Sequence, residues 1–228
     1  MGKKPIIGIV TKHFSKDEIR PNMFVRDEIK QAIFDNGGIA IGIILPKDEK
    51  VDVEDTWKNN FSATEYSNLI SQIKLCDGIL FQGGSACDNY EMIAAKYCYE
   101  NNIPTLGICC GQNVMVRALG GTTKLVENPE KHDTNDLYVH SVKIIKNTML
   151  SKIICKEKIK VNSRHKKTIN THPGLSVNCV CDDGYIDGLE ASDKTFYMAL
   201  RFHPESLYKI DENHNRIFNE FVKICKKD

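Results

Sequence analysis

The sequence predicts an α/β sandwich, with a mostly parallel central sheet and additional β-strands late in the chain. Two observations predict it. The first half alternates short apolar runs with stretches of helical periodicity, which is typical of β-α-β units. The second half instead carries closely spaced strand-like segments joined by short polar turns. We find no internal repeat, low-complexity segment or linker, and we therefore expect one domain over residues 1–228.

The first half opens β-α-β. Residues 5–11 form an apolar run typical of a buried strand, and residues 23–36 place apolar side chains at near-helical spacing. Gly37-Gly38 ends that helix, and residues 39–45 form a second buried strand. Residues 47–62 are polar and predicted to be irregular. The same alternation then predicts a helix near 64–75, a strand at 77–81, a helix at 88–102, a strand at 104–108 and a helix from Gly111 to Leu119.

The second half is predicted to be richer in strands. Several of these segments alternate apolar and polar residues, and short turns such as Asp182-Asp183-Gly184 join them. The expected strands are 137–145, 157–161, 175–181, 185–190 and 196–203, followed by an amphipathic helix at 211–226.

Composition excludes several classes of function. Apolar residues make up 41% of the 228-residue chain and charged residues 27%, as in an ordinary globular protein, and the formal net charge is +1. This balance, without a basic stripe and interleaved aromatics, argues against nucleic-acid binding. No apolar run approaches the length of a membrane helix. No signal-peptide pattern opens the chain, and the number of cysteines, nine, is odd. We therefore expect the protein to lie in the reducing cytoplasm.

So many thiols raise the question of a metal site. Cys179-Val180-Cys181 places two thiols on one face of a predicted strand, but the apolar Val180 favours a buried strand over a metal loop. No second pair of Cys or His residues has the sequence spacing that is typical of a zinc site. We therefore expect neither a metal nor an organic cofactor.

The sharpest feature is Gly107-Ile108-Cys109-Cys110-Gly111. An apolar strand ends at Ile108 and a helix begins almost at once, so Cys109 is expected at the carboxyl edge of the sheet, where open α/β sheets place their sites. The positive end of the following helix favours a reactive thiolate there. The alternative is that Cys109 has no role in chemistry and packs as a small buried apolar side chain. The glycine pattern places Cys109 at the apex, so Cys110 is expected to contribute its backbone N–H instead.

A cysteine nucleophile needs a base and often an acid that orients the base. Phe202-His203-Pro204-Glu205 supplies both side chains just after a predicted strand. Taken separately, His203 is also compatible with a solvated loop and Glu205 with a surface position. Gln82-Gly83-Gly84 follows another strand and is expected to reach the same edge, where its backbone N–H groups could stabilise an oxyanion; an ordinary turn is the alternative.

Together these pieces resemble the class I glutamine amidotransferase superfamily over nearly the whole chain. That family has a G-x-C-x-G-x-Q elbow, here Gly107 to Asn113, a late H-P-E, here His203 to Glu205, and a Gly-Gly turn, here Gly83-Gly84. Within it the chain looks most like the γ-glutamyl hydrolase branch (peptidase C26), which includes γ-glutamyl-γ-aminobutyrate hydrolases. The segments that carry this likeness are Gly120-Gly121-Thr122, Val161-Asn162-Ser163-Arg164-His165 and Asp183 to Glu190.

The resemblance implies a flavodoxin-like three-layer sandwich and hydrolysis of a small γ-glutamyl compound through a thioester. In that scheme Cys109 is the nucleophile, His203 the base and Glu205 its orienting acid. Backbone N–H groups of Gly84 and Cys110 would hold the oxyanion. The expected substrate-binding residues are Gly83, Asn113, Ser163 and His165.

The sequence departs from the family pattern at four positions, where it carries Gln82, Asn113, Lys166 and Arg201. The stretch between Gly84 and Asp88 is also short. These changes alter the expected pocket walls and leave the amine leaving group open. They leave the three expected catalytic residues in place.

Two other classes of function stay open. One is a glutaminase subunit that supplies ammonia to a separate synthase partner. The other is a non-catalytic binding protein, against which the intact Cys109, His203 and Glu205 argue. The sequence does not define the oligomeric state; a homodimer is common for such folds.

Overall fold

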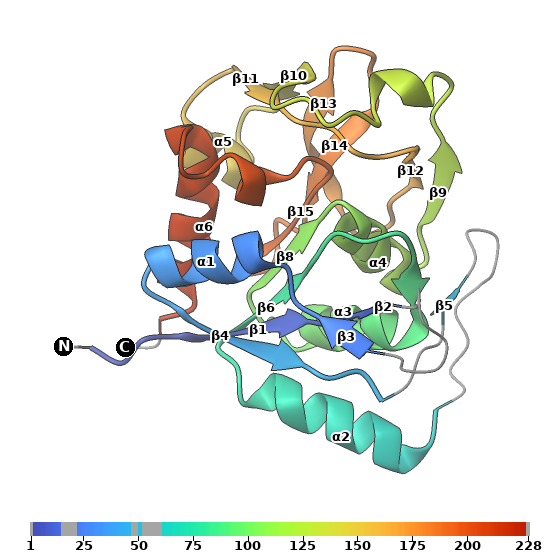
Figure 1. Ribbon diagram of the computed structural model, residues 1–228, viewed down its shortest axis with the longest axis vertical. Helices are drawn as coiled ribbons and strands as arrows, with labels where there is room; N and C mark the ends of the chain where they lie inside the picture. The colour runs from blue at the N-terminus through green and yellow to red at the C-terminus, as the bar shows by residue number, and fades with distance from the viewer. Residues whose placement is uncertain (1, 15–21, 47–49, 52–60, 227–228) are drawn as a thin grey trace.

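A nine-stranded mixed sheet runs through the molecule (Figure 1). The computed structural model describes residues 2–14, 22–46, 50–51 and 61–226. One half of the sheet is parallel, in the order β4 (Ile39–Ile43), β1 (Ile6–Val10), β6 (Gly78–Phe81), β8 (Thr105–Ile108) and β15 (Tyr197–Leu200). The other half is antiparallel and continues through β14 (Ile186–Glu190), β13 (Ser176–Cys181), β10 (His140–Ile144) and β11 (Lys158–Val161).

Helices cover both faces of this sheet. The helices are α1 (Asp27–Asp35), α2 (Ala63–Lys74), α3 (Asn89–Glu100), α4 (Cys110–Ala118), α5 (Met149–Ile154) and α6 (Glu212–Ile224). Apolar residues of α1, α5 and α6 share one buried cluster, whereas those of α2, α3 and α4 share another. The three-layer α/β sandwich expected from the sequence is therefore confirmed. None of the helices in the described residues is long and apolar enough to cross a membrane.

The central strands form where the sequence has apolar runs without polar alternation. All residues of β6, β8 and β15 are buried, because helices cover both of their faces. By contrast β4 lies at the sheet edge and is partly exposed. After α1 the chain turns at Gly37, whose φ of 85° is a conformation that favours glycine.

The structure differs from the predicted elements mainly at short strands. The helix expected over 23–36 begins only at Asp27, because β3 (Asn22–Phe24) pairs with β2 (Lys12–Phe14). The strands expected at 137–145 and 196–203 are shorter than predicted, as is the final helix. Within the region expected to be irregular, β5 (Lys50–Val51) pairs with β7 (Cys87–Asp88); residues 47–49 and 52–60 lie outside the described residues.

Five elements of the second half were not predicted: two strands, one helix and two 3-10 helices. A two-stranded ribbon joins β9 (Thr122–Leu125) to β12 (Lys167–Thr171), and α5 follows β10. Two single-turn 3-10 helices are the other two, η1 (Pro129–Lys131) and η2 (Pro204–Ser206). The ribbon residues are polar and largely exposed, so they lack the apolar pattern that indicates a strand in sequence.

Candidate functional site

The carboxyl ends of three neighbouring parallel strands bring the expected site residues together. β6 pairs with β8, and β8 pairs with β15, so the segments that follow these strands meet at one edge. Gln82 follows β6, Cys109 follows β8, and the segment from Arg201 to Glu205 follows β15. Two positions 94 residues apart in sequence, 109 and 203, thus lie at the same edge of the sheet.

Cys109 stands on a strained turn between β8 and α4. Its φ of 52° and ψ of −104° are rare for a residue with a side chain, and its backbone N–H donates to the carbonyl of Leu200 at 2.8 Å. The flanking glycines allow close approach: a Cβ at Gly107 would overlap the sulfur of Met115, and one at Gly111 would overlap the carbonyl oxygen of Phe81. This is the elbow geometry predicted for Cys109.

Replacing Gly111 with alanine is expected to lower the free energy of unfolding by about 1–3 kcal/mol, because the new methyl group meets backbone rather than a movable side chain. Chemical denaturation monitored by circular dichroism measures this. Gly42→Ala is the matched control, since a Cβ there would meet only ordinary contacts at 3.4 Å or more. Equal stability of the two variants would contradict the close-approach argument.

His203 is held in place from two sides. Its Nδ1 lies 2.7 Å from Oε1 of Glu205, and its backbone exchanges two hydrogen bonds with the side chain of Asn162, at 2.7 and 2.9 Å. The Nε2 atom makes no hydrogen bond to the described residues. Sequence reasoning missed the role of Asn162, although it lies within the segment that carries the family resemblance.

Cys109 and His203 converge on one backbone position, Gly83. A Cβ at Gly83 would lie 2.9 Å from Cε1 of His203 and 3.5 Å from Cβ of Cys109. Burial opposes the charged form of His203, but the negative charges of Glu205 and Cys109 outweigh it and raise the pKa of the imidazole to about 10. This arrangement favours an imidazolium beside the thiol at neutral pH.

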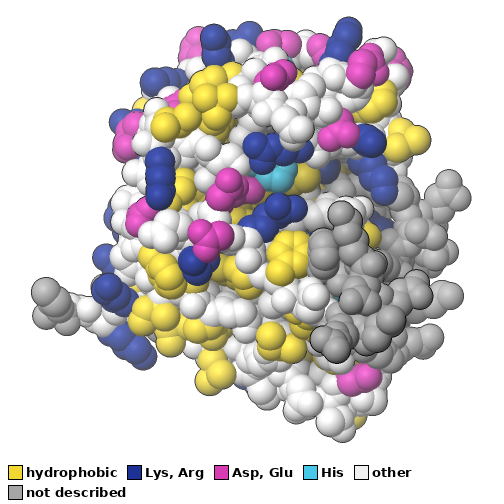
Figure 2. Space-filling view, viewed as in Figure 1, with side chains coloured by type: hydrophobic (Ala, Val, Ile, Leu, Met, Phe, Trp, Pro, Cys, Tyr) yellow, Lys and Arg dark blue, Asp and Glu magenta, His cyan; other side chains and the backbone are white. Residues whose placement is uncertain are grey.

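A cavity of about 460 Å³ opens onto Cys109. Its walls carry five cationic side chains and one carboxylate, that of Asp133. The cationic residues are Arg117, Arg164, Lys166, Lys167 and Arg201. Figure 2 shows a histidine side chain between two groups of Lys and Arg side chains on the face in view. The charge balance of the walls favours an anionic ligand.

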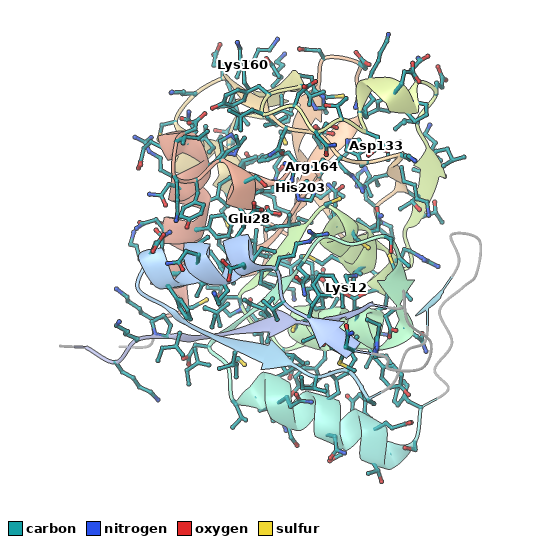
Figure 3. The ribbon with its side chains drawn as sticks, in the orientation of Figure 1. Lys12, Glu28, Asp133, Lys160, Arg164 and His203 are labelled. Carbon is teal, nitrogen blue, oxygen red and sulfur yellow. The ribbon has the colours of Figure 1, made fainter. Side chains whose placement is uncertain are left out.

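The segment after β11 forms one wall of this cavity. Figure 3 shows Asp133, Arg164 and His203 in one region of the molecule. Arg164 forms an isolated β-bridge with Asp133, its Nη1 donates to Oγ of Ser206 at 3.1 Å, and its carbonyl lies 4.0 Å from Sγ of Cys109.

Two of the departures from the family pattern contact each other. Nη2 of Arg201 donates to Oδ1 of Asn113 at 2.8 Å, and Nη1 lies 3.4 Å from the carbonyl oxygen of Cys109. Arg201 is only 1% exposed, and its Nε has no hydrogen-bond partner among the described residues. The short Asn113 side chain thus accepts from a guanidinium that lines the cavity.

The expected substrate-binding residues do not all reach the cavity. Asn113 and His165 line it, and Gly83 lies against Cys109 and His203. The prediction that Ser163 lines the pocket is wrong: its side chain is fully buried, and its hydroxyl donates to the carbonyl of His132 at 2.6 Å. Burial and the charge of Arg201 lower the pKa of His165 to about 2, which keeps that ring neutral.

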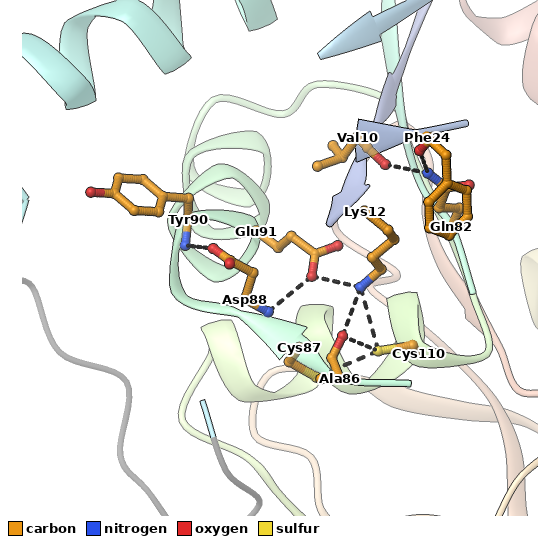
Figure 4. A network of polar contacts seen from close by, with 10 residues as sticks. All are labelled: Val10, Lys12, Phe24, Gln82, Ala86, Cys87, Asp88, Tyr90, Glu91 and Cys110. Carbon is orange, nitrogen blue, oxygen red and sulfur yellow. Dashed lines mark hydrogen bonds and ion pairs between the residues drawn. The ribbon is translucent and has the colours of Figure 1, made fainter. Parts of the chain in front are cut away.

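Lys12 supports the turn expected to hold the oxyanion (Figure 4). Its Nζ donates to Oε2 of Glu91 at 2.6 Å and to the carbonyl of Ala86 at 3.0 Å, and it lies 3.5 Å from Sγ of Cys110. A Cβ at Gly84 would lie 3.0 Å from Cε of Lys12. No pattern in the sequence marks this residue, because a single lysine after an apolar strand resembles a surface position.

Cys110 belongs to this network. Its Sγ donates to the carbonyl of Ala86 at 3.1 Å and lies 3.7 Å from Sγ of Cys87. The hydrogen bond from Cys87, together with the charge of Lys12, lowers the pKa of the Cys110 thiol against the effect of burial. The contacts of the Cys110 thiol are thus with Lys12, Ala86 and Cys87, as expected if its side chain points elsewhere than that of Cys109.

The Gln82 side chain ties the same turn to the start of the chain. Its Nε2 donates to the carbonyl oxygens of Val10 and Phe24 at 2.9 and 3.0 Å, and its Oε1 accepts from the backbone N–H of Arg26 at 2.9 Å. This third departure from the family pattern is therefore a bridge between β6, β1 and β3.

A family model described as Peptidase C26 matches residues 82–205, more than half of the chain, and spans Cys109, His203 and Glu205. The chain belongs to the Peptidase C26 family. Its fold is that of the class I glutamine amidotransferases. Membership of Peptidase C26 confirms the family expected from the sequence; the finer assignment to γ-glutamyl hydrolases stays a prediction.

The relatives of this Peptidase C26 protein include synthase components. The CTP synthase of Chlamydia trachomatis is 27% identical over 199 residues, which cover 72% of this chain but only 36% of that protein. One subunit of the glutamine-hydrolyzing GMP synthase of Sulfolobus acidocaldarius is 27% identical over 69% of this chain and 81% of its own length. The glutaminase domain of Trypanosoma brucei CTPS with bound acivicin superimposes with a TM-score of 0.65 at 19% identity, covering 98% of this chain and 95% of that chain.

Proposed function

We propose that this Peptidase C26 protein is a cysteine hydrolase that cleaves the γ-glutamyl amide bond of a small compound through a thioester. The observation that carries the proposal is the convergence of Cys109 with His203 and Glu205, together with the cationic cavity that Cys109 lines. A thiol on an elbow, a buried imidazole and a carboxylate that orients it make up the machinery of acyl transfer.

In this mechanism the Cys109 thiolate attacks the δ-carbonyl, and a bond forms between Sγ and the carbonyl carbon. The C–N bond breaks as His203 gives its proton to the departing amine. Water then attacks the thioester while His203 takes a proton from it, the C–S bond breaks, and glutamate leaves. Backbone N–H groups of Gly84 and Cys110 are the proposed oxyanion donors.

The walls of the cavity favour substrates with more than one carboxylate. The glutamyl group already carries one. Lys166 is paired with Asp133 at 3.3 Å, but Arg164, Lys167 and Arg201 still give the walls more positive charge than one carboxylate needs. Arg201, held by Asn113, adds a buried guanidinium beside the elbow. An amine that itself bears a carboxylate, as γ-aminobutyrate does, therefore fits this cavity better than ammonia.

A panel of γ-glutamyl amides tests this substrate assignment, with glutamate release as the readout for the purified chain. We expect kcat/KM for amides whose amine carries a carboxylate to exceed that for glutamine by about tenfold or more, the size of one added charge interaction. Release of glutamate from none of the panel would reject the hydrolase.

The second candidate is a glutaminase subunit that supplies ammonia to a separate synthase. The observation that favours it is the similarity to the GMP synthase component, 81% of which this chain covers. Under this alternative glutamine is the preferred member of the panel, and its turnover rises when a synthase partner is added.

The pH dependence tests the role of Glu205. The wild-type kcat/KM is expected to hold up to about pH 10, where His203 loses its proton, because the Glu205 and Cys109 charges raise the pKa of the imidazole. Glu205→Gln removes one of these charges, so the alkaline limb moves to lower pH and the rate falls by about 100-fold or more. Glu28→Gln, which changes an exposed carboxylate that contacts Ser206, is the control and leaves the limb in place.

A further inference from the structure

A buried group of metal-ligating side chains lies in the antiparallel half of the sheet. His140, Cys181 and Asp187 come from three neighbouring strands, β10, β13 and β14. One ligand atom from each lies within 4.8 Å of the other two, and Nε2 of His140 is 2.8 Å from Oδ2 of Asp187. A small shift of these three side chains would bring all three ligand atoms to bonding distance from one ion.

These groups are buried without enough partners. Asp187 is 1% exposed and Cys181 4%. Oδ1 of Asp187 and Nδ1 of His140 have no hydrogen-bond partner among the described residues. A buried carboxylate with an unused oxygen is costly, and a cation bound to it would remove that cost.

The turn after β13 holds Cys181 in a fixed backbone conformation. The turn is closed by a hydrogen bond from Cys181 N–H to the Tyr185 carbonyl at 3.0 Å and one from Gly184 N–H to the Cys181 carbonyl at 2.9 Å. These hydrogen bonds fix the backbone on both sides of the buried Cys181 thiol.

A second histidine stands next to the group. His132 is 2% exposed, its ring centroid lies 5.2 Å from that of His140, and neither of its ring nitrogens has a hydrogen-bond partner among the described residues. Its Nε2 lies 3.4 Å from Oδ2 of Asp183, an ion-pair distance only if the ring is protonated. His132 thus lies beside the group, although its ring is not among the ligand atoms that lie within 4.8 Å of one another.

We propose that His140, Cys181 and Asp187 bind one zinc ion, with His132 or water completing the coordination. A thiolate and a carboxylate supply two negative charges, which match a divalent cation. The mixed sulfur, nitrogen and oxygen donor set suits zinc and disfavours magnesium and calcium, which take oxygen ligands. This proposal goes against the expectation of no metal from the sequence, and it does not depend on the proposed hydrolase activity.

The ion would be structural and would hold a wall of the cavity. The ring of His132 packs on that of His165 at 5.1 Å, and His165 lines the cavity. The backbone carbonyl of Asp187 accepts from the N–H of Arg201 at 2.7 Å. Through these contacts, metal binding would order the segments on both sides of the cationic pocket.

Cobalt titration of the metal-free full chain tests the site. We expect one equivalent of Co²⁺ to produce visible bands of a four-coordinate ion and a near-ultraviolet thiolate-to-cobalt band, both displaced by Zn²⁺. Cys181→Ser is expected to abolish the thiolate band, and His140→Gln to weaken Zn²⁺ binding by about 100-fold or more. Circular dichroism confirms that the variants are folded, and the unfolding temperature of wild type rises when Zn²⁺ is added.

Two cysteine controls make the result specific. Cys155→Ser removes an exposed thiol, and Cys87→Ser breaks the close contact between the thiols of Cys87 and Cys110. Both variants are expected to keep the band. No thiolate band at equimolar cobalt, or a band that survives in Cys181→Ser, would overturn the proposal. If Cys181→Ser does not fold, retention of full Zn²⁺ affinity by His140→Gln would overturn it equally.

Discussion

Replacing Cys109 with alanine is expected to reduce the hydrolysis of γ-glutamyl amides by at least about 10⁴-fold, because the thioester cannot form without its sulfur. Glutamate release under saturating substrate measures this loss. The fold is expected to survive, since Cys109 is a small side chain at the edge of the sheet and its backbone conformation is set by the flanking glycines.

Cys110→Ala is the matched control, because it removes the neighbouring thiol from the same helix end. That variant is expected to keep its activity within about tenfold of wild type, since the Cys110 sulfur contacts Ala86 and Lys12 and only its backbone N–H is assigned to the reaction. A glutamine-mimicking electrophile supplies a second readout: a covalent adduct is expected on residue 109 alone. Equal loss of activity in both variants would reject Cys109 as the nucleophile.

Replacing Lys12 with methionine is expected to lower the free energy of unfolding by about 1–3 kcal/mol, because the buried Glu91 loses its ionic partner. Burial already raises the pKa of Glu91 to about 8, so its carboxyl group takes up a proton when the ammonium is removed. The two side chains are 7% and 0% exposed, so water cannot replace the lost ammonium. Burial opposes the charge on Lys12, but the neighbouring Cys110, Glu91 and Cys87 outweigh it and keep the pKa of the ammonium above its usual value. Urea denaturation of the purified variant measures the change.

The double variant Lys12→Met with Glu91→Leu distinguishes loss of the pair from loss of packing. Replacing both charges by apolar groups of similar volume is expected to recover most of the stability. If the double variant is as unstable as Lys12→Met alone, then the lysine stabilises the fold by some means other than its pairing with Glu91. Because Lys12 also donates to Ala86 beside Gly84, turnover by the double variant reports whether the oxyanion turn needs the ammonium itself.

The sequence predicted the layers of the fold because its central strands are buried on both faces. Uninterrupted runs of apolar or small residues lie at 78–81, 105–108 and 197–200. Such runs indicate the central strands of a sheet that is covered on both faces. The β9–β12 ribbon escaped prediction since most of its residues are polar, and among them only Thr168 and Ile169 are buried. It is defined by pairing between segments more than 40 residues apart, which no local pattern reveals.

The sequence predicted those residues of the candidate site that lie on turns with a recognisable pattern. Glycines around Cys109 and the proline after His203 are visible in the sequence, and the structure brings both side chains to one edge. Residues whose partners lie far away in the sequence escaped prediction. These are Lys12, Asn162 and the group formed by His140, Cys181 and Asp187. Ser163 was misplaced because its hydroxyl is used inside the fold, where it donates to the carbonyl of His132, whereas Arg164 and His165 line the cavity.

The position of β15 between β8 and β14 has a consequence for how the molecule is made. Until residues 197–200 emerge from the ribosome, one edge of β8 has no neighbour, and the whole antiparallel extension is synthesised before that gap is filled. Cys109 thus meets its histidine only after the last strand of the sheet has been made. Chains stalled in this interval would expose a bare apolar edge, a template for self-association, and would depend on chaperones to reach the finished enzyme.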